Sequence, residues 1–374
     1  MKKIAVFHPS NELYGADRIM VLATKAMATY QPVIYLPKNG PLTGFIKKEI
    51  PNAVVTILED MPIISRAIFT PKGVLNTTKK YLKFRRYFSS EMKVHQFEKI
   101  YVNTLACSFI LPALRSFKVP IITHVHEILE HPKVAAKITA KLAFKYSHTV
   151  ISVSQAVQNN LHLLAKKRKA KSIVVHNGIP AIELKIAPKN SAISFYLFGR
   201  IKPEKGQWYL MEALKIIPKI ELEGITFNLV GGTLAGKEQL KLDLENKIDS
   251  YGLKKHVHLK GFTADISEPL AQADVCLIPS LMKDPFPTTV LEAMSVGKAI
   301  IATDTGGAKE AIKHNESGFI IPPNSPIAFA QVIRKLIRNR MLIKKMGANA
   351  QDTFNENFTI EHFNDRWLNA VTAK

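Results

Sequence analysis

The sequence has few cysteines and no long apolar run. Cys107 and Cys276 are its only cysteines among 374 residues, and they lie far apart within apolar, strand-like stretches. This spacing argues against a disulfide framework or a cysteine metal cluster, and it predicts two buried thiols in a reducing compartment. The most apolar stretch, 105–114, is much shorter than the roughly 20 residues that cross a bilayer as a helix, so it predicts a buried element.

The first residues do not form the pattern of a secretory leader. The apolar run 4–7 ends at His8 and Pro9, which makes it too short for the core of a signal peptide. We therefore expect a cytoplasmic protein with no membrane-spanning segment.

Acidic residues are scarce in the first half of the chain. Residues 1–180 contain 27 Lys and Arg against 9 Asp and Glu, whereas the remainder contains 25 against 21. The first half is therefore expected to face an anionic partner, which could be nucleic acid, a phospholipid surface or a phosphate-bearing substrate. The sequence lacks a helix-turn-helix, RNA-recognition or zinc-finger pattern, so we expect no nucleic-acid partner.

The basic residues gather in two clusters. The stretch 79–88 interleaves five cations with four aromatic residues and a leucine, a pattern that favours a helix on an anionic membrane surface. An ordinary surface helix with a packed aromatic face is the alternative. The second cluster, 166–171, includes Arg168 and is interpreted as a solvated loop.

The periodicity predicts an α/β fold. The length exceeds the usual size of a single core, and apolar strand patterns alternate with helical patterns throughout. We expect two Rossmann-like, doubly wound domains that face each other across a cleft, with ligands at the carboxyl ends of the strands. The predicted strands are 3–8, 32–36, 53–57, 99–102, 120–124 and 149–153 in the first half, and 193–198, 225–230, 256–259, 274–278 and 298–302 in the second. Helices are expected at 17–27 in the first half and at 206–217, 237–250 and 289–296 in the second.

Turn residues place the linker between the halves. Asn177, Gly178 and Pro180 are followed by Pro188 and Asn190, which together predict a connection without regular structure. A last helix at about 360–372 carries apolar residues at helical spacing, so we expect one of its faces to be packed.

The strongest motif extends from Asp284 to Glu292, directly after an apolar strand pattern. Thr288 or Thr289 is expected to cap the following helix, whose first amides would form an anion site. Glu292, one turn into that helix, could accept hydrogen bonds from vicinal hydroxyls, while Asp284 would reach another part of the ligand. A structural capping box formed by Thr289 and Glu292 is the alternative.

The second motif extends from Gly199 to Gly206, where a strand pattern ends and a helical pattern begins. The glycine lets a ligand approach the backbone, and Arg200 and Lys205 bring two cations to the strand end. A cation about 4 Å from a phosphate contributes roughly 4 kcal/mol at an effective dielectric constant of about 20. Such a site fits a nucleoside diphosphate, although isolated loop cations are often simply solvated. No Asp-x-Asp and no His or Cys cluster is present, so we expect no metal or other cofactor.

These motifs together resemble glycosyltransferase family 4, whose members are retaining enzymes with the two-domain GT-B fold. The resemblance also rests on the turn at 14–17, on Ser154, on Asn177-Gly178 and on the segment 305–310. It implies a nucleoside-diphosphate sugar as the donor. The residues implied to bind it are Gly15, Gly199, Arg200, Lys205, Asp284, Phe286, Thr288, Thr289 and Glu292.

The resemblance assigns individual roles. It implies that Arg200 and Lys205 bind the diphosphate and that Glu292 binds the ribose. Asp284 would contact the transferred sugar, and His126 would contact that sugar or the acceptor. The chain departs from the family in having Asp284 where Glu is usual and Pro287 where Gly is usual. A proline cannot donate a backbone hydrogen bond to a ligand.

The resemblance also implies the organisation and setting of the protein. Residues 1–180 would bind the acceptor, 181–358 would bind the donor, and 359–374 would form a helix that crosses back to the first domain. We expect a glycan acceptor linked to a lipid, in bacterial cell-surface polysaccharide or lipopolysaccharide synthesis, with the enzyme peripheral on the inner face of the cytoplasmic membrane. The alternatives are a sugar phosphorylase or sugar-nucleotide epimerase of similar fold, and a nucleic-acid-binding protein.

Overall fold

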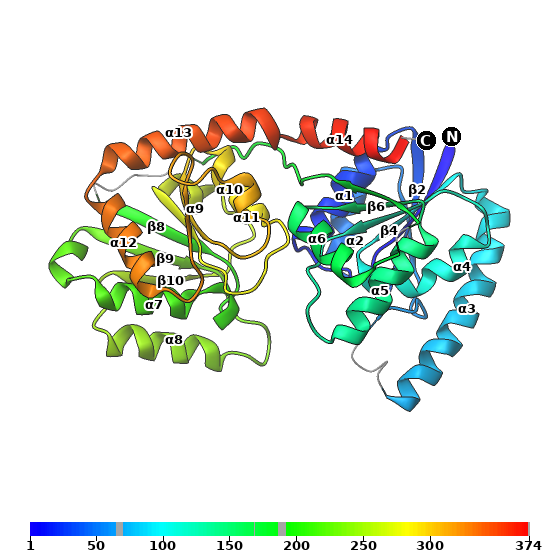
Figure 1. The fold of residues 1–374 in the computed structure, drawn as a ribbon, viewed down its shortest axis with the longest axis horizontal. Coiled ribbons are helices and arrows are strands. Elements are labelled where there is room, and N and C mark those ends of the chain that lie inside the picture. The colour runs from blue at the N-terminus through cyan, green and yellow to red at the C-terminus, as the bar shows by residue number, and fades with distance from the viewer. Residues whose placement is uncertain (65–69, 168, 186–191, 373–374) are drawn as a thin grey trace. The chain divides into compact units, whose positions relative to one another are not determined.

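The chain forms two compact α/β units (Figure 1). Unit 1 comprises Met1–Asn177 and Phe363–Lys374, and unit 2 comprises Gly178–His362. The computed structural model describes residues 1–64, 70–167, 169–185 and 192–372. Pro188 and Asn190 of the predicted linker, and Arg168 of the second basic cluster, lie outside the described residues.

Unit 1 is built on a parallel sheet of seven strands in the order β3-β2-β1-β4-β5-β6-β7. This order reverses direction beside β1, as in doubly wound folds. Every predicted strand of this half is present, and β7 is an additional strand. The strands are β1 Lys2–Phe7, β2 Tyr30–Leu36, β3 Val54–Ile57, β4 Lys99–Asn103, β5 Ile121–Val125, β6 Thr149–Ser152 and β7 Lys171–Val174.

Helices connect the strands of unit 1 (Figure 1). Their buried faces follow the apolar spacing of the sequence, as in α6, where Val157 and Leu161 are fully buried four residues apart. The helices are α1 Gly15–Ala26, α2 Pro41–Glu49, α3 Pro71–His95, η2 Leu105–Ile110, α4 Leu111–Arg115, α5 Lys133–Tyr146 and α6 Gln155–Leu164. None of the described helices in either unit is long and apolar enough to cross a bilayer.

The aromatic residues of α3 lie in the core. Phe84 and Phe88 are buried, their rings stack at 5.8 Å, and both contact the ring of Phe7 edge-on. These two side chains therefore cannot enter a bilayer, which corrects the part of the membrane prediction that rested on them. The alternative of a surface helix with a packed aromatic face describes α3, although Arg85 and Arg86 remain exposed.

The last helix, α14 Ile360–Thr372, completes the core of unit 1 with its residues from Phe363 onward. Trp367 is fully buried, and its ring lies 5.3 Å from that of Tyr101, 4.8 Å from that of His124 and 5.9 Å from that of Phe363. The apolar face expected for this helix is therefore packed.

Unit 2 is built on a parallel sheet of six strands in the order β10-β9-β8-β11-β12-β13, which is again the doubly wound order. All five strands predicted for this half are present, and β13 is an additional one. The strands are β8 Ile193–Phe198, β9 Ile225–Val230, β10 Val257–Gly261, β11 Val275–Ile278, β12 Ala299–Thr303 and β13 Phe319–Ile321.

The helices of unit 2 pack against its sheet, and the apolar core formed there includes the stacked rings of Phe195 and Phe227. Predicted and observed bounds of the three expected helices agree within two residues, whereas α12 and α13 were not predicted. The helices are η3 Pro203–Lys205, α7 Gln207–Ile216, η4 Lys219–Leu222, α8 Gln239–Ser250, α9 Ser267–Gln272, α10 Thr288–Ser295, α11 Ala308–Ala311, α12 Pro326–Ile337 and α13 Arg340–Asn357.

Both cysteines are free and buried, as expected from their apolar surroundings. Cys107 lies in η2, which corrects the expectation of a strand-like setting, and Cys276 lies in β11. Burial raises the pKa of the Cys276 thiol to about 12, so this side chain behaves as an apolar core residue near neutral pH.

Candidate functional site

The carboxyl edge of the unit 2 sheet brings the two predicted motifs together. Lys205 follows β8, Asp284 follows β11, and the Lys205 Nζ donates to Asp284 Oδ2 at 3.1 Å. The two residues are 79 positions apart in the sequence. Their side chains are 32% and 19% exposed, so the ion pair lies where a ligand could reach it. The fold therefore places one predicted cation and one predicted carboxylate in direct contact.

Glycines allow the loops at this edge to approach closely. Gly206 has a φ of 86°, and a Cβ there would lie 2.0 Å from the carbonyl oxygen of Pro279. Gly306 has a φ of 78°, and a Cβ there would lie 2.1 Å from the carbonyl oxygen of Asp284. The amide of Gly307 donates to that same oxygen at 2.9 Å. Only glycine fits at both positions, and the loop after β12 thereby holds the backbone of Asp284 in place.

Gly199 and Arg200 form the turn that leaves β8. The amide of Gly199 donates to the carbonyl of Val230 at 2.9 Å, and a Cβ on Gly231 would lie 2.0 Å from the Gly199 carbonyl oxygen. The side chain of Gln207 donates to the carbonyl of Arg200 at 2.9 Å. The turn is therefore fixed by its backbone, which leaves the half-buried Arg200 side chain on the same loop as Lys205.

Helix α10 begins differently from the prediction. Pro287 occupies its N-cap position, Thr288 is the first helical residue, and no side chain caps the helix. The expected cap by Thr288 or Thr289 is therefore wrong, and so is the alternative capping box with Glu292. Proline has no side-chain acceptor and its fixed φ suits the start of a helix, which explains why the helix begins there.

The N-cap residue of α10 offers no side-chain acceptor to the first-turn amides, which are the groups that an anion site uses. Thr288, Thr289 and Glu292 are half-buried along this end of the helix. Phe286 is buried instead, with its ring 5.8 Å from that of Phe358. Its side chain therefore anchors the loop within unit 2.

The carboxyl edge of the unit 1 sheet carries a second polar cluster. His8 follows β1, Asn103 ends β4, and His126 follows β5. Because β1, β4 and β5 are neighbours in the sheet, their carboxyl ends meet at one edge. His126, predicted from sequence, thus lies beside two residues that were not predicted.

A chain of hydrogen bonds links these residues to the carboxylate of Asp17. His8 Nε2 lies 2.6 Å from Asp17 Oδ1, and Asn103 Nδ2 lies 2.8 Å from His8 Nδ1. The Asn103 Oδ1 lies 3.0 Å from His126 Nε2, and it also accepts from the hydroxyl of Tyr101 at 2.8 Å. The cluster of Asp17, His8, Asn103 and His126 is called the relay below.

The carboxylate determines the direction of every donor in the relay. A carboxylate only accepts, so His8 carries its proton on Nε2 and its Nδ1 accepts from the Asn103 amide. The Asn103 oxygen must then accept, so His126 carries its proton on Nε2. The Nδ1 of His126 is left as an acceptor, and no described residue donates to it. These tautomers are assigned from the hydrogen-bond network.

Burial keeps the relay histidine neutral. Burial, with a smaller contribution from the adjacent His8, lowers the pKa of His126 to about 3, while Asp17 opposes the shift. Burial alone would raise the pKa of the Asp17 carboxyl, but hydrogen bonds from His8, Ser10 and the Tyr14 amide leave it below its ordinary value. The relay therefore joins an ionised carboxylate to a neutral imidazole at neutral pH.

Two further residues shape this edge. The carboxylate of Glu127 accepts from the amides of Leu105 and His126, at 3.1 and 3.0 Å, and thereby holds the backbone that carries the imidazole. Burial raises the pKa of Glu127, against these hydrogen bonds. Gly15 is the first residue of α1, next to Tyr14, whose amide donates to Asp17 at 2.7 Å. Among the described residues, no group of three or more His, Cys, Asp or Glu side chains could hold a metal ion.

Known protein families match most of the chain. Residues 44–181 match the family described as Glycosyltransferase Family 4, and residues 181–353 match the family described as Glycosyl transferases group 1. A glycosyltransferase of Methanocaldococcus jannaschii, named as uncharacterized, is 28% identical over 234 residues, which are 60% of each chain. The Escherichia coli UDP-Gal:alpha-D-GlcNAc-diphosphoundecaprenol alpha-1,3-galactosyltransferase is 28% identical over 194 residues, 50% of this chain and 48% of that enzyme. The chain thus spans less than two thirds of these curated relatives.

Solved structures resemble the whole chain. The crystal structure of Anabaena HepE in complex with UDP has a TM-score of 0.84, is 24% identical, and is covered over 100% of both chains. The two parallel sheets in Rossmann order, together with this likeness, show the GT-B fold. The chain belongs to glycosyltransferase family 4, since the two family matches together extend from residue 44 to residue 353.

Proposed function

We propose that the protein is a retaining glycosyltransferase that moves a sugar from a nucleoside-diphosphate sugar to a lipid-linked glycan. The observation that carries this proposal is the ion pair of Lys205 and Asp284 beside the uncapped start of α10. A cation, helical amides and a carboxylate at one sheet edge are the groups that a diphosphate and its attached sugar need. Family membership favours transfer over phosphorolysis, epimerisation or nucleic-acid binding.

In the proposed donor complex, Lys205 turns from Asp284 toward the diphosphate. Arg200 and the first amides of α10 offset the remaining negative charge, and Glu292 accepts hydrogen bonds from the ribose hydroxyls. Asp284, released from the lysine, accepts from the hydroxyls of the transferred sugar. As the glycosidic bond breaks, charge grows on the leaving phosphate oxygen, and the two cations stabilise it more strongly than in the ground state. No metal is needed for this stabilisation.

Retention of anomeric configuration follows from attack on the face that the diphosphate leaves. The acceptor oxygen bonds to the anomeric carbon while the leaving phosphate oxygen takes the hydroxyl proton. In this proposal His126 accepts a hydrogen bond from a sugar or acceptor hydroxyl through Nδ1. It holds the ligand and is not the general base, because a pKa of about 3 makes the neutral imidazole a weak base.

The donor and acceptor classes are supported by named relatives. HepE has been crystallised with UDP and with UDP-glucose, and the name of the Escherichia coli relative includes UDP-Gal and a diphosphoundecaprenol acceptor. We propose a uridine nucleotide as the donor carrier and a polyprenyl-diphosphate glycan as the acceptor. Such an acceptor would place the protein on the inner face of the cytoplasmic membrane, held there in part by the basic unit 1.

A ligand-binding experiment tests the proposal. UDP, GDP, ADP and their sugars would be compared by thermal shift, since a ligand at 100 times its dissociation constant stabilises by about 2.7 kcal/mol. We expect UDP to raise Tm, and we expect Lys205→Ala or Arg200→Ala to abolish the rise. Lys309→Ala, which removes an exposed lysine of unit 2 paired with Asp304, is the matched control. An equal shift in all variants would reject the proposed diphosphate site.

Anomeric configuration is tested on the product. A UDP-sugar would be incubated with a short-chain polyprenyl-diphosphate glycan, and the new linkage would be assigned by NMR. Inversion of configuration would reject the retaining mechanism, and release of free sugar without transfer would reject the acceptor.

A further inference from the structure

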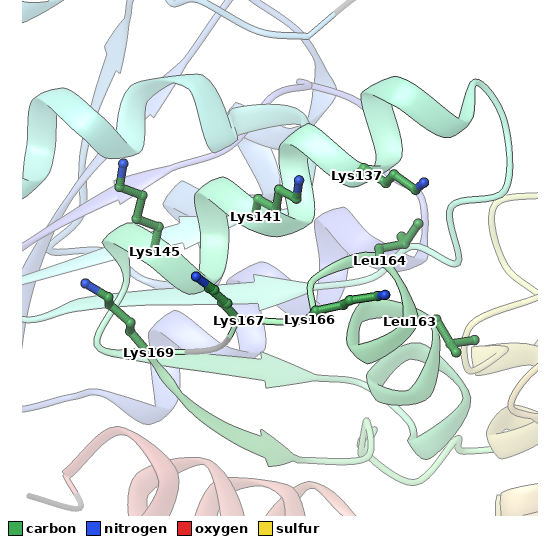
Figure 2. A pocket seen from close by; sticks show the side chains of 8 residues that line it. All are labelled: Lys137, Lys141, Lys145, Leu163, Leu164, Lys166, Lys167 and Lys169. Atoms are coloured by element: carbon green, nitrogen blue, oxygen red, sulfur yellow. The ribbon is translucent and has the colours of Figure 1, made fainter.

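A pocket of about 700 Å³ in unit 1 lies between α5 and the segment that follows α6 (Figure 2). Its lining is defined by lysines and two leucines. We call it the lysine pocket, and its residues are Lys137, Lys141, Lys145, Leu163, Leu164, Lys166, Lys167 and Lys169.

The six lysines come from α5 and from the segment that follows α6. Three of them repeat every four residues along α5 and so share one face of the helix, and the other three follow the end of α6 (Figure 2). Like charges four residues apart destabilise a helix. Within the described ranges, none of the six forms an ion pair with a carboxylate, and the Nζ of Lys145 lies 5.0 Å from the centre of the Tyr146 ring. An anionic partner would offset this repulsion.

Exposed apolar side chains accompany the lysines. Leu163 is 80% exposed, Val134 is 64% exposed and Ile138 is 42% exposed. At about 100° per residue, Val134 falls within the arc of α5 that carries its three pocket lysines, and Ile138 lies about 20° beyond the edge of that arc. Basic and apolar side chains on one surface match a bilayer interface, where headgroup phosphates meet acyl chains.

We propose that the lysine pocket binds phosphate headgroups of an anionic lipid bilayer. The lysine ammonium groups pair with the phosphates, and Leu163, Val134 and Ile138 enter the boundary between headgroups and acyl chains. The proposal rests on the proposed function only in its lipid-linked acceptor, and it gives the docking surface of unit 1 a location other than α3. Nucleic acid fits less well, because a phosphodiester backbone offers nothing to the exposed leucine.

Sedimentation with vesicles tests the location. The full chain would be mixed with phosphatidylglycerol vesicles and, separately, with phosphatidylcholine vesicles at about 150 mM salt. We expect binding to the anionic vesicles alone. Replacing the three α5 lysines by Gln should lower the partition coefficient by about a hundredfold, because each lysine near an anionic leaflet strengthens binding several-fold. The triple Lys→Arg variant should retain binding.

Two control variants carry the same loss of charge. The first replaces Lys47 and Lys48 of α2 and Lys93 of α3 by Gln. All three lysines are exposed. The second replaces Lys79, Arg85 and Arg86 of α3. Both should bind vesicles within a few-fold of the wild type. Equal losses in all three variants would show that net charge alone drives binding, and a loss confined to the α3 variant would place the contact there. Either result would overturn the proposal.

Two measurements distinguish the lipid proposal from the proposed donor site and from nucleic-acid binding. The UDP-induced rise in Tm should be the same in the α5 variant and the wild type, so a failed vesicle assay with an intact UDP response rejects the lysine pocket alone. A gel shift with single-stranded RNA under the same salt tests the competing partner. RNA binding that is tighter than vesicle binding and is lost in the α5 variant would assign the pocket to nucleic acid.

Discussion

One buried carboxylate sets the hydrogen-bonding role of a histidine at the edge of unit 1. Asp17 fixes the proton of His8, which fixes the orientation of the Asn103 amide and then the tautomer of His126. A neutral amide in place of Asp17 can both donate and accept, so it no longer imposes one direction on the relay.

We expect Asp17→Asn to lower kcat/KM by about ten- to a hundredfold, the range for loss of a group that orients a catalytic partner. UDP binding, which depends on unit 2, should remain. The control is Thr24→Val, which removes another buried polar group from α1, where the Thr24 hydroxyl donates to the carbonyl of Met20 at 2.8 Å. A structural role for Asp17 would lower Tm in both variants without a selective loss of kcat/KM, and that outcome would contradict the relay.

The sequence predicts these sites unevenly. Lys205, Asp284 and His126 could be proposed because each polar residue follows a strand pattern and belongs to a recognisable motif. The contact between Lys205 and Asp284 could not be predicted from the sequence, since it depends on β8 and β11 being neighbours in the sheet. His8 and Asn103 also follow or end apolar strands, so a search for polar residues at strand ends would have found them. The direction of their hydrogen bonds required the three-dimensional register of β1, β4 and β5.

At the scale of elements, the start of α10 was the main error. Thr288 and Thr289 fit the residue preference for a cap, but Pro287 takes the cap position and shifts both threonines into the helix. Local preference failed here because two adjacent candidates and a proline leave three possible starts within three residues.

Substitution of Thr288 and Thr289 tests whether either side chain caps α10. Thr288→Ala and Thr289→Ala should each change the free energy of unfolding by less than about 0.5 kcal/mol, whereas loss of a capping side chain typically costs about 1 kcal/mol. Ser325, which caps α12 by accepting from the amide of Ala328, provides the positive control as Ser325→Ala. Urea unfolding measures all three, and a cost for Thr288→Ala equal to that of the control would restore the predicted cap.

The loop after β12 positions Asp284 through a close backbone contact. Gly306→Ala combines a left-handed φ with a Cβ 2.1 Å from the Asp284 carbonyl oxygen, so we expect it to displace the loop and reduce the UDP-induced rise in Tm by more than half. Gly224→Ala is the control, because its φ of 69° is also left-handed but its Cβ would meet nothing within 4 Å. A retained UDP response in Gly306→Ala would show that Asp284 tolerates movement.

The elements missed by the sequence analysis are short or lie far from the motifs. Strand β7 has four residues beside a lysine cluster, and β13 has three. The longer α12 and α13 follow the last predicted strand, where no motif drew attention to the apolar spacing. The doubly wound fold was predicted because long alternating patterns dominate both halves.

At the scale of the whole molecule, buried histidines make stability depend on pH. Burial lowers the pKa of His126 to about 3 from an ordinary value of 6.5, and it also lowers the pKa of His124. Between these values the unfolded chain binds more protons than the native protein. The free energy of unfolding therefore falls as the pH decreases from 6.5 toward 3.

We expect His126→Gln to reduce the slope of the free energy of unfolding against pH by the equivalent of up to about one bound proton, because the variant no longer takes up that proton on unfolding. Urea unfolding at pH 7, 6 and 5 provides the slope. His362→Gln, which changes an exposed histidine, is the control and should leave the slope unchanged. Identical slopes in the wild type and His126→Gln would show that His126 is not held neutral by the fold.

The packing of Trp367 has a consequence for the order in which the protein is made. Unit 2 is a continuous segment, whereas the hydrophobic interior of unit 1 needs a side chain that is translated only after all of unit 2. During synthesis, the core of unit 1 lacks this side chain beside β4 and β5 at a time when all residues of unit 2 have already been translated. Folding of unit 1 should therefore be completed only after Trp367 has left the ribosome, later than the folding of unit 2.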